Sequence, residues 1–181
     1  DVVGSTICGY QYVTDHTECF MKIANKVGSG VQVRLILDTG NFIDSSCSRQ
    51  AARIAELWDA ACPLKVMRGQ QKGGCFPCMH AKTWIFDGKV VLTGSVNMTH
   101  NGLEHNKEHL WRITGPAVPE VVADFEECWA LAEPVNQKMI DAMLAKSLKT
   151  KANRKKESHV VRSLSKDLTE VGDTASSGRS L

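Results

Sequence analysis

Residues 5–67 alternate between β-prone apolar runs and stretches with helical periodicity. The runs at 5–12, 31–37 and 64–67 predict strands, and the stretches at 16–27 and 45–61 carry apolar residues every three or four positions, as amphipathic helices do. Strands that alternate with helices in this way form a parallel sheet. The run at 31–37 becomes fully apolar toward its end, which is typical of a strand buried on both faces.

The second half of the chain predicts a hairpin, a further strand and a helix. Residues 80–86 and 89–93 flank Asp87-Gly88, a strong signal for a tight hairpin turn. A strand is expected at 108–113, and a helix at 119–132 with proline near its first turn. One α/β domain over 1–134 accommodates all of these elements.

Charge separates the end of the chain from this domain. Residues 1–145 contain 13 basic and 16 acidic side chains, whereas residues 146–181 contain 9 basic and 4 acidic ones and no aromatic residue. Such a composition buries too little apolar surface to fold alone. We therefore expect an amphipathic helix at 135–148 and a disordered basic tail at 149–181.

Several classes of protein are disfavoured by composition. The sequence contains no run of about 18 apolar residues, which a membrane-spanning helix requires. Seven cysteines, an odd number spread along the chain, do not fit a small disulfide-stabilised secreted domain. We therefore expect an intracellular, reducing location. The chain starts at Asp1 inside a predicted strand, so we also expect residues upstream of it.

Two residues near the hairpin have the chemistry of phosphoryl transfer. His80 and Lys82 lie two positions apart on a predicted strand, so their side chains leave the same face. The ammonium group can hold phosphoryl oxygens while the imidazole acts as a nucleophile or base near neutral pH. An isolated pair of this kind is usually a solvated surface feature, and the residues that follow it in order are what strengthen the prediction.

Four later residues can complete such a site. A backbone N–H and a hydroxyl at Gly94-Ser95 can bind the same anion, and Asn97 adds an amide donor. Glu108, on a neighbouring predicted strand, can hold the second imidazole nitrogen of His80 and so select its tautomer.

This pattern resembles the signature of the phospholipase D superfamily. The motif H-x-K-x4-D followed by G-S-x-N is complete here, and the N-x-E that often follows also matches. The matching residues are His80, Lys82, Asp87, Gly94, Ser95, Asn97, Asn106 and Glu108. The resemblance extends over about residues 5–129 and is greatest to the single-motif members, namely the mitochondrial cardiolipin hydrolase (Zucchini-like) proteins and small bacterial endonucleases. It implies a mixed β-sheet flanked by helices.

The resemblance also implies a mechanism. It predicts a metal-independent phosphodiesterase without cofactors, in which His80 forms a phosphohistidine, Lys82, Ser95 and Asn97 bind the phosphate, and Glu108 orients His80. Asp87 is expected to be a structural hairpin residue rather than a proton carrier. Because the family's active site uses two motifs and this chain has one, a homodimer with a shared active site is expected.

The substrate and the location stay open at this stage. A phospholipid headgroup ester of the cardiolipin or phosphatidylcholine type is our first expectation, a single-strand endonuclease acting on RNA or DNA is the second, and an inactive interaction module is the third. The net acidic domain slightly favours lipid, because it offers no broad basic surface for phosphates. By resemblance, a mitochondrial surface is a candidate location.

Three further features have alternative interpretations. Cys75 and Cys78 have the spacing of zinc ligands without a matching second pair, and a plain or redox-labile loop pair is the preferred interpretation. Trp84 and Phe86 are expected to pack on the sheet rather than stack on bases. The stripe at 135–148 can pack on the domain, while residues 135–156 can also contact an anionic membrane surface or bind nucleic acid.

Overall fold

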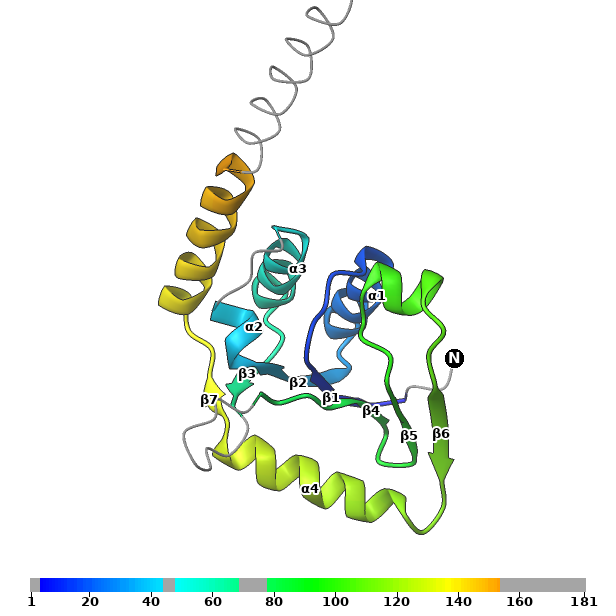
Figure 1. Ribbon diagram of the computed structural model, residues 1–181. Coiled ribbons are helices and arrows are strands. Elements are labelled where there is room, and N and C mark those ends of the chain that lie inside the picture. Colours follow the sequence, from blue (N-terminus) through cyan, green and yellow to red (C-terminus); the bar gives the residue numbers. More distant parts are fainter. Residues whose placement is uncertain (1–3, 44–47, 69–77, 154–181) are drawn as a thin grey trace, which may run out of the picture.

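The protein is a seven-stranded mixed sheet with helices on both faces (Figure 1). The computed structural model describes residues 4–43, 48–68 and 78–153. Its elements are β1 (Thr6–Gln11), α1 (Thr17–Gly28), β2 (Gln32–Asp38), α2 (Thr39–Ile43), α3 (Ser48–Asp59), β3 (Leu64–Met67), β4 (Lys82–Phe86), β5 (Val90–Gly94), the π-helix η1 (Asn101–His105), β6 (Leu110–Thr114), α4 (Val118–Leu131) and β7 (Glu133–Pro134). A further helix covers residues 137–153.

The strand order is β6-β5-β4-β1-β2-β3-β7. β1, β2 and β3 pair in parallel, as the strand–helix alternation predicts. β4 pairs antiparallel with β1, and β5 and β6 continue as an antiparallel meander. The predicted α/β class with a mixed sheet and flanking helices is therefore confirmed. The disordered tail was predicted at 149–181, but residues 149–153 are helical, and residues 154–181 lie outside the described residues.

Two hydrophobic cores lie on opposite faces of the sheet. One packs beneath α1 and α3 and includes Phe20, Leu35 and Ile54. The other packs against α4 and includes Ile85 and Phe125. Phe125 is fully buried, so its truncation to alanine is expected to cost about 3–5 kcal/mol of stability. The separation into two cores follows from strand geometry, because successive side chains of a strand point to opposite faces of the sheet.

The helix at 137–153 packs on the domain through its apolar stripe. Ile140 and Met143 are buried in the core beneath α1 and α3, and Met139 and Leu144 pack against it. Leu148 remains exposed. Packing is thus confirmed for the stripe, and membrane contact through 135–156 stays a prediction. Among the described residues, no helix is both long and apolar enough to cross a bilayer.

Candidate active site

His80 and Lys82 meet at one end of two central strands, where β1 ends and β4 begins. Lys82 is the first residue of β4 and is 6% exposed, while His80 precedes the strand and is exposed. The Lys82 Nζ lies 2.9 Å from each ring nitrogen of His80 and donates to the His80 carbonyl oxygen at 2.7 Å. Burial lowers the pKa of Lys82, and the charges of Cys78 and Glu108 act in the opposite direction. The expected pair is therefore formed, although His80 itself lies outside the strand.

Two residues outside the sequence motif lie beside His80, one bound to the preceding residue and one in contact with its ring. Asp38, buried at the end of β2, accepts a hydrogen bond from the backbone N–H of Met79 at 2.9 Å. The ring of Tyr12, just after β1, lies edge-on to the His80 ring with centroids 4.3 Å apart, and Lys82 Nζ lies 5.0 Å from the Tyr12 ring centroid. A carboxylate at the end of an apolar strand was the available signal for Asp38.

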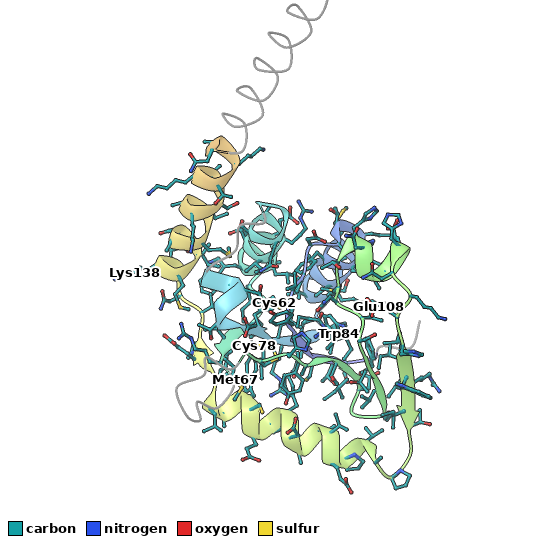
Figure 2. The ribbon with its side chains drawn as sticks, in the orientation of Figure 1. Cys62, Met67, Cys78, Trp84, Glu108 and Lys138 are labelled. Carbon is teal, nitrogen blue, oxygen red and sulfur yellow. The ribbon has the colours of Figure 1, made fainter. Side chains whose placement is uncertain are left out.

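A hydrogen bond between Ser95 and Glu108 connects the end of β5 to the start of β6. Figure 2 labels Glu108 on the segment that leads to β6. The Ser95 hydroxyl donates to the Glu108 carboxylate and accepts from the His109 backbone N–H at 3.1 Å. The Asn106 amide donates to the other Glu108 oxygen at 3.0 Å. The hydrogen bonds from Ser95 and Asn106, together with the positive charge of Lys82, hold the pKa of Glu108 below its usual value. Within the described residues, Glu108 has these partners and no hydrogen bond to His80.

Close backbone packing explains two glycines around the site. A Cβ at Gly94 would lie 2.0 Å from the His109 carbonyl oxygen, and one at Gly102 would lie 2.4 Å from the Asn97 carbonyl oxygen. Only glycine permits such approaches. The Asn97 Oδ1 is buried and has no hydrogen-bond partner within the described residues. This atom is a hydrogen-bond acceptor and does not bind phosphoryl oxygens, so phosphate binding by the amide N–H₂ of Asn97 stays a prediction.

Asp87 lies at the opposite end of β4 from His80, in the hairpin turn with φ 53°. Its carboxylate accepts hydrogen bonds from the backbone N–H groups of Gly4, Ser5 and Thr6 at 2.7–2.9 Å. The fold brings Lys82, Ser95, Asn97 and Glu108 to the edge where His80 lies, and it does not bring Asp87 there. The contacts of Asp87 are those of a hairpin residue, as the sequence analysis expected.

The proposed cysteine pair can be described only at one position. Cys78 is exposed and bridges to Arg68 in a short antiparallel contact, while Cys75 lies outside the described residues. Metal binding by Cys75 and Cys78 therefore stays a prediction. The described part of the chain instead shows a different cluster of metal-binding side chains, near α1 and η1.

An apolar cavity of about 260 Å³ adjoins the Lys82 side chain. It lies between α1, the sheet and the segment around η1, and apart from Lys82 and Lys22 its wall is apolar. Trp84 forms part of this wall and packs directly over Gly9, where a Cβ would lie 2.8 Å from the indole ring. The expected packing role of Trp84 is therefore confirmed.

A family model agrees with the geometry of the site. Residues 4–129 match the model described as "Cardiolipin synthase, PLD-like domain". The chain belongs to the phospholipase D superfamily. It is accordingly an enzyme of the phosphodiesterase type that characterises this superfamily. No curated protein sequence matches it.

Solved structures share the fold of this phospholipase D-like chain. Nuc from Salmonella typhimurium, a phospholipase D family member, is 20% identical with a TM-score of 0.64, covering 76% of this chain and 86% of that one. NucT from Helicobacter pylori is 18% identical with a TM-score of 0.67, covering 74% and 84%. Phosphatidylserine synthase from Haemophilus influenzae is 14% identical with a TM-score of 0.55, covering 87% of this chain and 41% of that one.

Proposed function

We propose that this phosphodiesterase hydrolyses a phospholipid headgroup ester through covalent catalysis by His80. The cavity beside Lys82 is the observation that supports a lipid substrate. Its wall is apolar except for two lysine side chains, and one of them, Lys82, contacts the proposed nucleophile. A ligand that joins an apolar chain to a phosphodiester matches this arrangement, because the apolar part loses contact with water while the phosphate meets a cation.

The chemistry proceeds in two balanced steps. A ring nitrogen of His80 attacks phosphorus, the P–O bond to the leaving group breaks, and a proton passes to the leaving oxygen. Water then attacks phosphorus and gives a proton to the group that protonated the leaving oxygen, the P–N bond breaks, and His80 is released while the phosphate stays on the product. Lys82 and Asn97 bind the phosphoryl oxygens on which charge develops. The Glu108 network holds the start of β6 beside them.

A second copy of the chain supplies the general acid in this proposal. One motif provides one histidine, which acts as the nucleophile, so the proton for the leaving oxygen must come from another group. His80 is exposed just before the central strand β4, so it can face the same residue of another copy. The edge strand β6 also presents Leu110 and Trp111, which are 55% and 66% exposed. Exposed apolar side chains on an edge strand support contact with a second copy.

A substrate comparison tests the proposal. Purified protein in EDTA is assayed on liposomes that contain cardiolipin or phosphatidylcholine and on labelled single-stranded RNA and DNA. We expect lipid turnover that falls about 10⁴-fold or more in His80→Ala and is unchanged in Lys89→Ala, an exposed residue in the turn between β4 and β5. Cleavage of nucleic acid alone would make the protein an endonuclease, and no turnover of any substrate would favour an interaction module.

A cavity variant tests the role of the apolar wall separately. Leu103 lines the cavity and is 43% exposed, so Leu103→Trp can fill the space without a buried clash. We expect lower activity on liposomes and unchanged activity on bis(p-nitrophenyl) phosphate, a small diester without an acyl chain. Equal loss on both substrates, or none on either, contradicts a lipid-binding cavity.

A further inference from the structure

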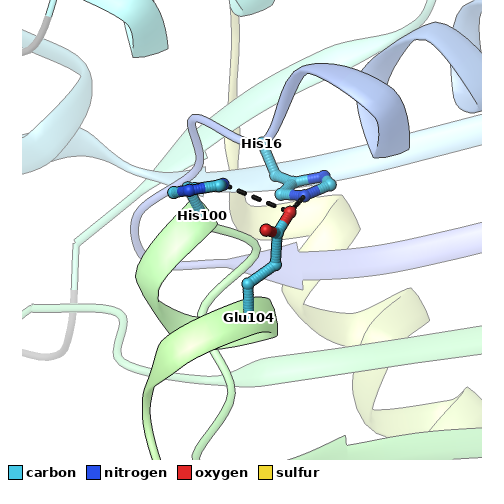
Figure 3. A group of neighbouring side chains, drawn as sticks. All are labelled: His16, His100 and Glu104. Atoms are coloured by element: carbon cyan, nitrogen blue, oxygen red, sulfur yellow. Dashed lines mark hydrogen bonds and ion pairs between the residues drawn. The ribbon is translucent and has the colours of Figure 1, made fainter.

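Three side chains from two distant segments converge on one point between α1 and η1 (Figure 3). His16 immediately precedes α1, His100 immediately precedes η1, and Glu104 lies within η1. One oxygen of Glu104, Oε1, lies 2.8 Å from His16 Nε2 and 3.2 Å from His100 Nδ1. None of its members lines the cavity beside Lys82, and the side-chain contacts given above for His80 are with Lys82 and Tyr12 rather than with this cluster.

The spacing of these atoms suits a transition metal. Zinc binds histidine nitrogen and carboxylate oxygen at about 2.0–2.2 Å, which places the ligand atoms about 3.3 Å apart at a tetrahedral centre. The Glu104–His100 separation of 3.2 Å matches this value, the Glu104–His16 separation of 2.8 Å is shorter, and all three ligand atoms lie within 4.8 Å of one another. Small side-chain movements therefore suffice to admit the ion. Two histidines and one carboxylate also leave a fourth position for water.

Hydrogen bonds to His100 and His16 decide which ring nitrogen of each imidazole carries the proton and which is free for a metal. His100 Nε2 lies 3.2 Å from His105 Nε2, so a proton on His100 Nε2 can be donated to His105 while Nδ1 stays free for the metal. Such outer contacts orient metal-binding imidazoles. His16 Nδ1 accepts a long bond of 3.4 Å from the Cys19 backbone N–H. Binding through Nε2 moves the His16 proton to Nδ1 and gives up this weak contact.

The surroundings favour a cation. The cluster borders a hollow of about 250 Å³ whose other lining residues include Asp15 and Glu18. Asp15 accepts a hydrogen bond from the His100 backbone N–H at 3.0 Å, and Glu18 forms an ion pair with Lys22. His100 and Glu104 are each 47% exposed, whereas His16 is 11% exposed. An ion can therefore enter from solvent and reach the less exposed imidazole.

We propose that His16, His100 and Glu104 bind a divalent transition metal, with zinc as the expected ion. The ion would join the start of α1 to η1, the segment that leads directly to Asn106 and Glu108. In this role the ion tethers the two segments, with water at its fourth position. It leaves the His80 chemistry free of metal, and it does not depend on which phosphodiester the enzyme cleaves.

Metal titrations of the full chain test this site. Zinc binding is measured by calorimetry and Co²⁺ binding by visible absorption, in the parent protein and in His16→Asn, His100→Ala and Glu104→Gln. Asparagine at position 16 keeps an N-cap group, so that variant removes the imidazole while it preserves the helix start. A Cys75→Ser/Cys78→Ser variant separates this site from the cysteine pair.

We expect one bound ion per chain and an affinity about tenfold or more weaker in each of the three ligand variants, with the double cysteine variant unchanged. Zinc should also raise the Tm of the parent protein and not that of His100→Ala, since a ligand of the folded state stabilises it. Circular dichroism confirms that each variant is folded. Absence of binding, binding that survives all three substitutions, or binding lost in the double cysteine variant would overturn the proposal.

Discussion

Asp87 shows how a motif residue can serve the fold rather than the reaction. Three backbone N–H groups and the Ser5 hydroxyl surround its carboxylate, and the backbone bonds lower its pKa to about 2. These bonds attach the start of β1 to the turn between β4 and β5. The ionised carboxylate therefore stabilises the folded state, in which its pKa lies below the usual value of 3.8.

The sign of this effect gives a pH prediction. The stabilisation is complete above the unfolded pKa and is lost as pH falls through the folded pKa, that is, between about pH 4 and pH 2. Asp87→Asn should lower the urea midpoint at pH 5 and show a shallower decline than the parent between pH 4 and pH 2. Asp59→Asn, at the exposed end of α3, is the control and should follow the parent. A parallel decline in parent and Asp87→Asn contradicts this role.

The close backbone packing at Gly94 leads to a second prediction for a single residue. Its missing Cβ allows the His109 carbonyl to approach, and the adjacent Ser95–Glu108 bond depends on that approach. Gly94→Ala should push β6 away, lower Tm, and reduce kcat by about 100-fold, as an ångström of misplacement can do. Gly28→Ala is the matched control, because a Cβ there meets nothing within 4 Å. Activity on bis(p-nitrophenyl) phosphate and thermal melts measure both effects.

At the scale of elements, the segment before β4 depends on the end of β2. Asp38 accepts from the Met79 N–H and from the Asn41 backbone and side chain, so it joins α2 to the residue before His80. In Asp38→Asn an N–H₂ group replaces one acceptor oxygen and faces a donor. We expect a loss of about 1–3 kcal/mol of stability and a lower kcat with little change in KM, since the variant misplaces His80 without touching substrate.

Steady-state kinetics on bis(p-nitrophenyl) phosphate and urea unfolding measure these two effects. Asn41→Ala is the comparison, because it removes the side-chain bond to Asp38 and leaves the Met79 bond in place. It should reduce stability with kcat largely retained. If Asp38→Asn and Asn41→Ala reduce kcat equally, Asp38 has no specific role in positioning His80.

Strand periodicity and the order of motif residues predicted most elements near their observed bounds. β3 begins and ends where the apolar run does, at Leu64 and Met67. The same signals missed α2, η1 and β7, which are short and whose formation depends on neighbours that are distant in sequence. These signals also predicted that His80 lies on the strand, whereas β4 begins at Lys82. Alternation of residue types does not show at which residue hydrogen-bonded strand pairing starts.

The site was predictable as a set of residues and not as a network. The sequence motif indicated His80, Lys82, Ser95 and Glu108, but it could not show that Ser95 binds Glu108. Likewise, residues 12–16 carry no local signal for the His80 pocket or the His16 cluster, and the place of Asp38 at the end of an apolar strand does not show which backbone group it binds. Contacts between positions separated by 40 to 90 residues follow from tertiary packing, so a single sequence leaves them open.

At the scale of the whole molecule, the shared-site proposal predicts how mixed dimers behave. If each active site needs His80 from both copies, a dimer of one parent and one His80→Ala chain is inactive. Activity then falls as the square of the parent fraction. An equal mixture retains about one quarter of full activity, against about one half for independent sites.

The two chains are mixed under denaturing conditions, refolded together and assayed on bis(p-nitrophenyl) phosphate at constant total protein. A mixture of parent with Lys138→Ala is the control and should keep full activity.

Trp111→Lys, which charges the exposed edge of β6, tests the interface independently. It should give monomers by light scattering and lose activity with the fold intact, because each monomer carries half of the catalytic pair. A linear decline in the mixtures, together with an active monomeric Trp111→Lys, would show that one chain contains the complete site.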